Sequence, residues 1–375
     1  MKILYLSSKK NWGGVTNWMN QTALGLGKRG HAVHIIAHPD GRFVRSASPK
    51  LTIIPRKLGM DYNPVMVAYI RRFIRQQQID LMVTNIEKEV MIGGIASRLG
   101  RIPNIRRVGR EDDFNEKRRV KWHHRWLVDR CIVPCNSIRD NAMRRATWLD
   151  GSNFVTIYNG RNLADISVAE RRRQRRDWGV RDDEVVIGVT AQLIPIKGVD
   201  HLMRVFARLL GTQANCRLVI TGEGRQRPSL DALADSLAVA PNVVFAGYSA
   251  DPIRTAGAYD IAVCPSLFEG FPNTVVEYLA AGRPVVTTEA GGVTEMIRHR
   301  ENGLLVPCGD EDRLFEKIKE LLLDRDLSMT LQRNARQTIR EKFSEDIMLD
   351  QLEAFFRQTI QQYRRITDKR IICSG

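Results

Sequence analysis

Long hydrophobic runs are missing from this sequence. None of its apolar stretches approaches the roughly 18–20 residues that a helix needs to cross a bilayer. A strand is expected from Ile3 to Leu6, directly after Met1 and Lys2, so we expect no signal peptide. These features predict a protein of the cytoplasm, with any membrane contact limited to a peripheral one on the inner face of the cytoplasmic membrane.

Cysteine is scarce and is not arranged for redox or metal chemistry. The chain of 375 residues has six cysteines, and the spacing of Cys131 and Cys135 matches neither a redox nor a zinc motif. The carboxylates of Glu111–Asp113 are of the kind that hard cations prefer. Because Lys117 and Arg118 follow shortly after, we interpret this run as a solvated surface. We therefore expect reduced thiols and no bound metal.

The glycine fingerprint of nicotinamide enzymes is incomplete. A dehydrogenase would need a full GxGxxG with an acidic residue about 20 positions later. Aromatic-basic RNA motifs and a helix-turn-helix are not apparent either. A basic nucleic-acid-binding protein remains an alternative because the formal net charge is +16, but we expect no nucleic-acid partner.

The positive charge is concentrated in the first half. Residues 1–160 contain 28 Lys and Arg against 12 Asp and Glu, whereas residues 161–375 contain 30 of each. This asymmetry indicates that the first half meets something anionic, such as nucleic acid, anionic lipid or a phosphorylated glycan. A generally basic proteome is the alternative explanation.

A basic, tryptophan-bearing stretch at Lys117–Arg130 is the most unusual part of this half. It predicts a helix in which Trp122 and Trp126 share one side, surrounded by cations. Such a helix can lie on an anionic membrane surface, and a core helix with basic flanks is equally consistent with the pattern. We expect His123 and His124 to be surface residues rather than ligands.

The composition allows two α/β domains, each with its own core. Hydrophobic residues make up 43% of the chain and charged residues 27%. The opening pattern is a strand, a loop ending in Gly13 and Gly14, a helix to about Arg29 and a strand over His31–Ala37. This order is Rossmann-like, and ligands in such sheets bind at the carboxyl ends of the strands.

The stretch from Ser266 to Ile297 combines a loop, a helix, a strand and a second glycine-rich turn. We predict the helix over Thr274–Ala281 and the strand over Pro284–Thr288. Free amides at a helix amino terminus bind phosphate, and the Gly270–Asn273 loop allows a diphosphate to approach the backbone. The stretch therefore predicts an anion site, with Gly291 and Gly292 opening a turn into another helix.

Carboxylates flank this anion site on both sides. Glu269 lies just before the helix and Glu277 about two turns later. Carboxylates repel phosphate, so hydroxyl groups are their expected partners, and the combination describes a nucleotide sugar. Lys197, which ends the segment AQLIPIK after the strand Val185–Val189, would meet a diphosphate leaving group. For either glutamate alone, a solvated surface loop is the alternative interpretation.

These motifs resemble the carboxy-terminal half of the GT4 family, retaining glycosyltransferases of the GT-B fold. The resemblance is carried by Glu269-x7-Glu277 enclosing Gly-Phe-Pro-Asn, by Ala-Gly-Arg-Pro-Val-Val at Ala281–Val286, and by Gly291-Gly292. It implies an α/β protein with two Rossmann-like domains facing a central cleft. The expected domains are 1–165, basic and on the acceptor side, and 166–343, which binds the nucleotide sugar. Residues 344–375 would form a helix returning to the first domain, plus a tail.

The resemblance also implies roles for individual residues. Glu277 would hold the ribose hydroxyls and Glu269 the hydroxyls of the donor sugar. Two positions depart from the family pattern, because Gln192 stands where Arg is common and Arg110 lies where many members carry His. The predicted donor contacts are Gly13, Gly14, Gly222, Tyr248, Gly270, Phe271, Pro272, Asn273, Thr274 and Glu277, and the predicted catalytic residues are Lys197, Gln192, Glu269 and Arg110.

The predicted function is transfer of a hexosyl group, with retention of configuration, to a hydroxyl of a glycan or lipid-linked acceptor. We expect a UDP-sugar as donor substrate, no other cofactor, and a role in bacterial cell-surface polysaccharide or lipopolysaccharide synthesis. A nucleotide-sugar 2-epimerase of the same fold is the alternative enzyme.

Overall fold

The structure, a computed structural model, describes residues 1–11, 13–46, 48–110, 113–212 and 215–372. The chain forms two compact units. Unit 1 consists of Met1–Asn159 together with Glu345–Gly375, and unit 2 of Gly160–Ser344. The sequence predicted these divisions after residues 165 and 343.

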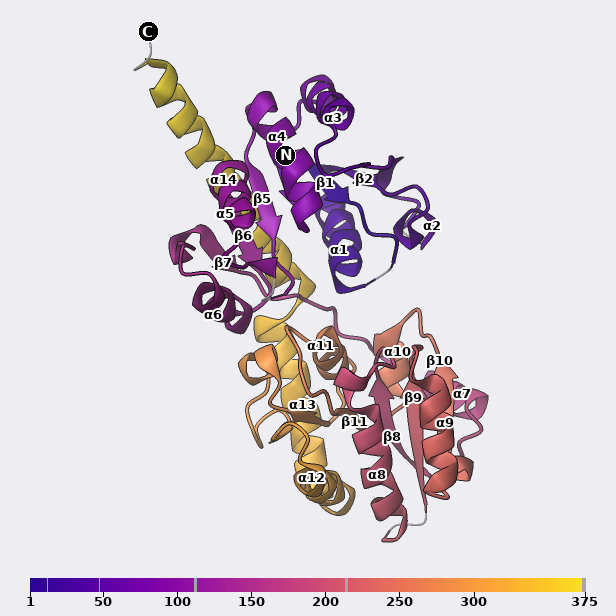
Figure 1. Ribbon diagram of the computed structural model, residues 1–375. Coiled ribbons are helices and arrows are strands. Elements are labelled where there is room, and N and C mark those ends of the chain that lie inside the picture. Colours follow the sequence, from indigo (N-terminus) through magenta and orange to yellow (C-terminus); the bar gives the residue numbers. More distant parts are fainter. Residues whose placement is uncertain (12, 47, 111–112, 213–214, 373–375) are drawn as a thin grey trace. The chain divides into compact units, whose positions relative to one another are not determined.

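Unit 1 is built on a parallel sheet whose described strands run in the order β3-β2-β1-β4-β5-β6-β7 (Figure 1). The order reverses between β1 and β4, which is typical of a doubly wound sheet. Its elements are β1 (Lys2–Ser7), α1 (Gly14–Lys28), β2 (Ala32–Ala37), α2 (Arg42–Ser46), β3 (Thr52–Pro55), α3 (Pro64–Gln77), β4 (Leu81–Thr84), α4 (Glu87–Gly100), β5 (Asn104–Arg107), α5 (Arg118–Leu127), β6 (Arg130–Val133), α6 (Asn136–Arg145), β7 (Phe154–Thr156) and α14 (Glu345–Ile372).

Both faces of this sheet are buried, as a parallel sheet requires. Along β1, Ile3 and Tyr5 join a core with side chains of α1 and α14. Leu4 and Leu6, which point to the opposite face, join a core with side chains of α3 and α4. The alternation of side chains along a strand therefore divides the apolar residues of β1 between two helical layers.

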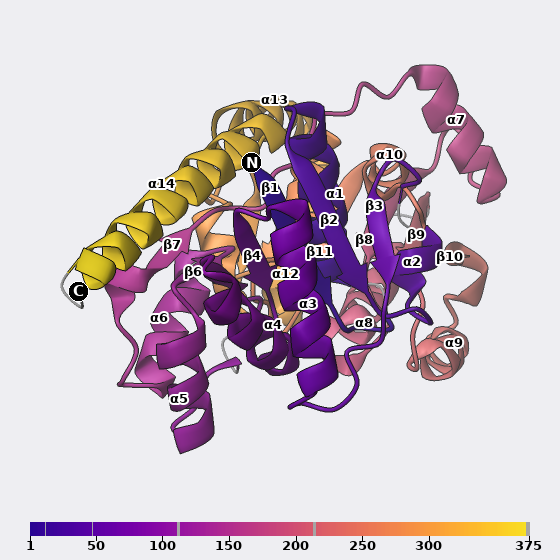
Figure 2. The same cartoon turned by 90° about the horizontal axis from the view of Figure 1, so that it is seen from above.

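Helix α14 belongs to unit 1 although it ends the chain. It is a single long helix (Figure 2). Its Leu349 packs against Gly25 of α1 so closely that a Cβ at Gly25 would lie 2.5 Å from Leu349 Cδ1. Arg29 forms ion pairs with Asp346 at 3.0 Å and Asp350 at 2.6 Å. This packing on the first domain is what the GT-B fold class predicts for a carboxy-terminal helix.

Unit 2 has a second parallel sheet, with the described strands in the order β10-β9-β8-β11-β12-β13. Side chains of α8, α9 and α12 cover one face in a continuous core. Its elements are α7 (Val168–Asp177), β8 (Val185–Thr190), α8 (Val199–Leu210), β9 (Cys216–Thr221), α9 (Arg227–Ser236), β10 (Val243–Gly247), α10 (Pro252–Gly257), β11 (Ile261–Cys264), α11 (Asn273–Ala280), β12 (Val285–Thr288), β13 (Leu304–Val306), α12 (Glu311–Leu323) and α13 (Arg325–Lys342).

Two expectations about local structure are wrong. Gly291–Glu295 forms a short 3-10 turn rather than opening an α-helix. His123 and His124 are buried, with 2% and 8% of their surface exposed, instead of lying on the surface. In α5 they share the inner side with Leu127, whereas Trp122 and Trp126 are 53% and 57% exposed. The inner side of this helix is thus partly polar, which the apolar pattern of the sequence does not reveal.

None of the helices in the described ranges is long and apolar enough to span a membrane. Within the same ranges, His, Cys, Asp and Glu side chains do not gather in a group of three or more suited to a metal ion. Glu111 and Asp112, part of the acidic run considered above, lie outside the described residues.

Candidate active site

Strands β8 and β11 mark the point in the sheet of unit 2 where the strand order changes direction. All neighbouring strands are parallel, so the loops that follow them leave from one edge. In open α/β sheets, ligands bind beyond the carboxyl ends of the strands at such a point. The loops here are residues 191–198 and 265–272, which contain Lys197 and Glu269.

The two loops are packed directly on each other. Leu267 donates its backbone N–H to the Ile196 carbonyl at 2.9 Å. Gly198 has a φ of +62°, and a Cβ on it would lie 2.2 Å from the Pro265 carbonyl oxygen. Only glycine fits this turn without strain, which explains the Lys-Gly pair in the sequence. The turn Pro195–Lys197 is consequently held beside the Glu269 loop.

Lys197 and Glu269 are brought together by this packing. Lys197 Nζ lies 2.6 Å from Glu269 Oε1, and Ser266 Oγ donates to the same oxygen at 2.7 Å. The side chains are 23% and 10% exposed, so the pair is only partly shielded from solvent. Within the described chain, Glu269 Oε2 has no hydrogen-bond donor. This arrangement leaves one carboxylate oxygen able to accept from a hydroxyl while the cation stays adjacent.

A second glycine-rich turn supports the loop that carries Glu269. Gly292 donates its N–H to the Gly270 carbonyl at 2.8 Å. Gly291 has a φ of +56°, and a Cβ there would lie 1.8 Å from the Glu269 carbonyl oxygen. Glycine is therefore required at residue 291 for both its conformation and its close backbone contact. The two glycine-rich segments, about 20 residues apart, form one local structure.

Helix α11 begins at Asn273, directly after this loop. Pro272 is the N-cap residue and its side chain makes no capping hydrogen bond, so the first amides of the helix are not satisfied by a side-chain cap. The predicted donor contacts Phe271 and Thr274 flank this start, and Phe271 is 9% exposed. The positive end of the helix dipole lies here and favours an anion.

Glu277 lies within α11 and is buried, so it belongs neither to a loop nor to the exposed surface. Its Oε1 accepts from Arg161 Nε at 3.2 Å and from Arg161 Nη2 at 3.0 Å. Burial raises the pKa of Glu277 above its ordinary value, and the charge of Arg161 opposes that rise. None of the described residues donates to Glu277 Oε2. The ion pair thus orients the carboxylate and leaves one oxygen for a hydroxyl ligand.

Arg161 was not identified from the sequence. It follows Asn159-Gly160, where unit 1 gives way to unit 2. Its backbone N–H donates to the Phe343 carbonyl at 2.8 Å, and its Nη1 donates to the Gly160 carbonyl at 2.9 Å. No local pattern would have paired it with Glu277, because the two residues are 116 positions apart.

Gln192, Gly222 and Tyr248 lie in three neighbouring loops at the same edge of the sheet. Gly222 donates to the Gly247 carbonyl at 2.7 Å, and a Cβ on it would lie 1.8 Å from the Ala191 carbonyl oxygen. The Gly222 turn therefore packs between the other two loops. Gln192 is exposed and Tyr248 is 51% exposed, so both side chains are accessible to a ligand.

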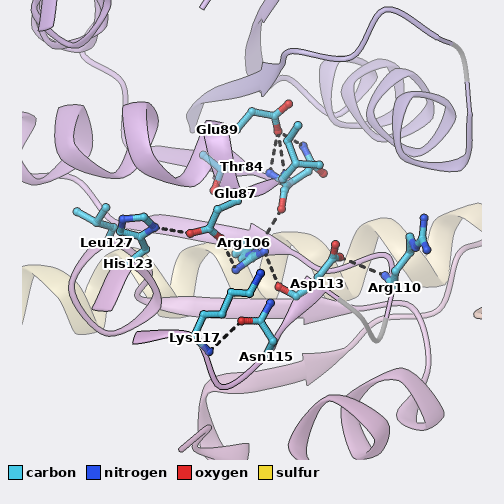
Figure 3. Close-up of polar contacts among 12 residues, drawn as sticks. Thr84, Glu87, Glu89, Arg106, Arg110, Asp113, Asn115, Lys117, His123 and Leu127 are labelled. Carbon is cyan, nitrogen blue, oxygen red and sulfur yellow. Dashed lines mark hydrogen bonds and ion pairs between the residues drawn. The ribbon is translucent and has the colours of Figure 1, made fainter. Parts of the chain in front are cut away.

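The remaining predicted residues belong to unit 1. Gly13 precedes α1, and its N–H donates to Thr16 Oγ1 at 2.7 Å. Gly14 is the first residue of that helix. Arg110 follows β5; its side chain is exposed and its backbone N–H donates to Asp113 Oδ2 at 3.2 Å (Figure 3). These residues lie beyond the carboxyl ends of β1 and β5.

Unit 1 also contains a buried polar cluster that the sequence did not predict. Arg106, 1% exposed, has Nη1 3.5 Å from Glu87 Oε2 and donates from Nη2 to the Asp113 carbonyl at 3.2 Å (Figure 3). Glu87 Oε1 also contacts His123 Nδ1. Burial, together with the charge of Arg106, lowers the pKa of His124 to about 4. His124 is therefore uncharged at neutral pH and adds no positive charge beside Arg106.

Two family models match the chain in succession. The model described as Glycosyltransferase Family 4 matches residues 12–165, and the model described as Glycosyl transferases group 1 matches residues 170–338. The chain belongs to the GT4 family of glycosyltransferases. This membership accounts for the paired sheets, the glycine-rich turns and the two carboxylates of unit 2.

Relatives of this GT4 glycosyltransferase match it over different lengths. The capsular polysaccharide biosynthesis glycosyltransferase CapM of Staphylococcus aureus is 28% identical over 90% of this chain and 92% of its own length. An uncharacterized glycosyltransferase of Methanocaldococcus jannaschii is 34% identical over 51% of this chain, which spans about half of that relative. The crystal structure of Anabaena HepE in complex with UDP-glucose covers 96% of this chain and all of its own, with a TM-score of 0.83 and 22% identity. That structural likeness confirms the GT-B fold.

Proposed function

We propose that this glycosyltransferase moves a hexosyl group from a UDP-sugar to a hydroxyl of a glycan or lipid-linked acceptor, with the anomeric configuration retained. The observation that carries the proposal is the Lys197–Glu269 pair beside the start of α11, at the point where the strand order reverses. This edge offers a cation, the positive end of a helix dipole and a carboxylate oxygen beside one pair of packed loops. Those groups match the diphosphate and the sugar of one donor.

In the proposed reaction, the acceptor oxygen bonds to donor C1 from the face that the phosphate leaves. The bond from C1 to the phosphate oxygen breaks with its electron pair on that oxygen, which takes the acceptor proton. Charge grows on the phosphate, so Lys197, Gln192 and the backbone N–H groups of Phe271, Asn273 and Thr274 would stabilise it. Glu269 would hold sugar hydroxyls and Glu277, oriented by Arg161, the ribose hydroxyls.

A double displacement through an enzyme carboxylate is not favoured. That mechanism uses a nucleophile and an acid about 5–5.5 Å apart. Glu269 is engaged by Lys197 and Ser266, and Glu277 by Arg161. Both carboxylates are therefore better suited to holding hydroxyls than to attacking carbon.

The acceptor is proposed to be a precursor of a bacterial cell-surface polysaccharide, capsule or lipopolysaccharide. CapM, which matches most of this chain, acts in capsular polysaccharide biosynthesis. A UDP-sugar donor is supported by the UDP-glucose bound to the structurally similar HepE.

We further propose a peripheral contact of unit 1 with an anionic membrane surface. On α5, Trp122 and Trp126 are more than half exposed, and the cations Lys121 and Arg125 are exposed beside them. Amphipathic tryptophan rings and basic side chains together favour the interface of an anionic bilayer. This outer side of α5 would bring the enzyme to a lipid-linked acceptor.

The test of the proposed reaction begins with thermal unfolding in the presence of UDP-, GDP- and ADP-sugars. The true donor should raise the melting temperature, because a ligand of the folded state stabilises it. With that donor and extracts of lipid-linked glycans, NMR of the product should show the anomeric configuration of the donor. An inverted product would contradict retention, and an epimerised donor formed without acceptor would instead establish the 2-epimerase.

A further inference from the structure

A cavity of about 230 Å³ lies in unit 1 beside helix α5. Its lining comes from α5, from the turn that leads into β6 and from the loop that precedes β7. Because β6 and β7 both begin there, the cavity is at the amino ends of the strands, whereas Gly13 and Arg110 lie beyond the carboxyl ends. It is therefore separate from the residues predicted to meet the donor. Pockets for drug-sized ligands measure about 300–1,000 Å³, so this smaller volume suits a compact polar group.

The cavity carries positive charge that the protein does not neutralise. Lys121 and Arg125 are one turn apart on α5, line the cavity and are exposed. Neither side chain forms an ion pair with any of the described residues. Asp129 also lines the cavity, but its carboxylate is already paired with Arg98 at 3.0 Å and accepts the Asn104 backbone N–H at 2.8 Å. The α5 side of the cavity thus favours an anion.

Two buried polar side chains of the lining are incompletely hydrogen-bonded. His124 is 8% exposed, and its Nδ1 has no hydrogen-bond partner within the described ranges. Arg130 Nε also lacks an acceptor there, although Arg130 Nη1 donates to Gln362 Oε1 at 2.9 Å. Buried polar atoms without a partner are uncommon and cost free energy. Their presence in one lining favours a polar ligand for the cavity.

The loop before β7 contributes a carboxylate and an amide to the same cavity. Asp150 is exposed, and the Asn153 side chain makes no hydrogen bond with any described residue. Trp148 lies in the lining with them and is fixed by its indole N–H, which donates to the Asn115 carbonyl at 3.2 Å. A carboxylate repels phosphate but accepts from hydroxyl groups, as an amide oxygen also does. The lining thus combines groups for an anion with groups for hydroxyls.

The place of the cavity on α5 favours a membrane lipid as the source of such a ligand. Trp122 and Trp126 directly follow Lys121 and Arg125 and are more than half exposed. Tryptophan rings at a bilayer surface lie at the level of the lipid headgroups. In the membrane contact proposed for α5, the two cations would therefore lie at the level of the lipid phosphates.

We propose that this cavity binds a phosphate ester that bears free hydroxyl groups, such as the phosphoglycerol headgroup of an anionic lipid. Lys121 and Arg125 would hold the phosphate, and Asp150 and Asn153 the hydroxyls. The inference deepens the proposed function and rests on its membrane contact for the lipid source. A soluble phosphate ester of a small polyol has the same chemistry and is the second source to be tested.

The site can be observed in the full-length protein labelled with 5-fluorotryptophan, which has six tryptophans. The Trp148 signal is the one absent from the fluorine spectrum of Trp148→Phe. We expect it to shift saturably with sn-glycerol 3-phosphate and with dihexanoyl phosphatidylglycerol, more weakly with inorganic phosphate, and not with glycerol. The signal of Trp178, which follows α7 in unit 2, should not move.

A matched pair of variants tests the cation. Lys121→Gln should weaken the binding of sn-glycerol 3-phosphate by about tenfold, because one charged hydrogen-bond donor is lost. Arg119→Gln removes the same charge from an exposed residue of α5 that does not line the cavity, and it should leave the affinity unchanged. Equal losses in both variants would contradict a contact through Lys121.

Vesicles separate the two sources. Wild-type protein should bind phosphatidylglycerol vesicles more tightly than phosphatidylserine vesicles with the same fraction of anionic lipid. Asn153→Trp fills the cavity without changing the charge, so it should abolish this preference and keep the binding common to both lipids. A Trp148 shift with sn-glycerol 3-phosphate but without a preference for phosphatidylglycerol assigns the site to a soluble phosphate ester.

A Trp148 signal that neither sn-glycerol 3-phosphate nor dihexanoyl phosphatidylglycerol moves would overturn the proposal, and this titration uses the unsubstituted chain. Equal affinity for inorganic phosphate would overturn the role of Asp150 and Asn153. Failure of the membrane contact is distinguishable from failure of the site. If vesicles bind while Trp148 is unmoved, only the site is rejected; if Trp148 shifts and no vesicle binds, the site stands without the membrane contact.

Discussion

Units 1 and 2 share the same sheet plan but differ in how they balance charge. Unit 1 contains 33 Lys and Arg against 17 Asp and Glu, whereas unit 2 contains 25 of each. In unit 2, Lys197 is paired with Glu269 and Arg161 with Glu277. In the described part of unit 1, Arg107 is buried and forms no ion pair, and only the charge of Asp113 opposes the effect of burial on its pKa. Unit 2 thus has no net formal charge, whereas the excess positive charge of unit 1 would favour an anionic partner.

The largest effect is expected from breaking the ion pair of unit 2. Lys197→Ala should reduce kcat by about 100- to 1,000-fold, the usual result of removing one group that stabilises transition-state charge. Glu269→Ala should reduce turnover as well, and steady-state assays with the identified donor measure both. Lys317→Ala is the matched control, since Lys317 pairs with Glu320 at 2.7 Å in the same unit. Full turnover in both variants would remove the proposed mechanism.

The buried ion pair between Arg161 and Glu277 provides a test that combines stability with pH. Arg161→Ala leaves the Glu277 carboxylate buried and unpaired, and we expect a loss of about 3–5 kcal/mol in the free energy of unfolding at pH 8. Loss of Arg161 removes the interaction that opposes the raised pKa of Glu277. Denaturant unfolding at several pH values measures the change.

The direction of the pH dependence follows from that pKa. In the folded variant Glu277 holds its proton more tightly than in the unfolded chain, so stability falls as the pH rises from the unfolded value through the folded one. The destabilisation should therefore be smaller near pH 5 than at pH 8. The double variant Arg161→Ala/Glu277→Gln should lose this difference; an equal loss at both pH values in the single variant would contradict the account.

The excess charge of unit 1 can be tested on vesicles. Each basic residue near an anionic bilayer contributes about 1 kcal/mol, so Lys121→Gln/Arg125→Gln should weaken binding to phosphatidylserine vesicles by about 30-fold. Co-sedimentation at low salt measures it. The matched control is Arg172→Gln/Arg173→Gln on α7, an exposed basic helix of the neutral unit. Equal losses for both double variants would indicate a general charge effect instead of a contact through α5.

The smallest effect concerns Gln192, the uncharged residue beside the predicted diphosphate site. Gln192→Arg should strengthen UDP binding by about fivefold, because a charged donor makes a stronger hydrogen bond to phosphate than a neutral one. Gln192→Leu removes the donor and should weaken binding. Isothermal titration of UDP into each protein gives the affinities, and no change in either variant would exclude Gln192 from the donor site.

Much of unit 2 could be predicted because its signals are local. The β-branched runs indicated β8 and β12, and the glycines at 198, 222 and 291 lie where backbones approach too closely for a side chain. Less of unit 1 was predictable. Strand β3 was not identified, and the inward direction of His123 and His124 in α5 was predicted wrongly, because helical spacing alone does not say which side a mixed helix buries.

The sequence by itself determined the family, the order of strands and helices in most of the chain, and the uneven distribution of charge. These properties depend on residue types and short spacings along the chain. Only the tertiary structure decided which charges are paired: Arg106 meets Glu87, Arg161 meets Glu277, and Arg107 forms no ion pair with any of the described residues. The reason is that an ion pair requires an approach of a few ångströms, and that approach depends on how distant segments pack rather than on their separation in sequence.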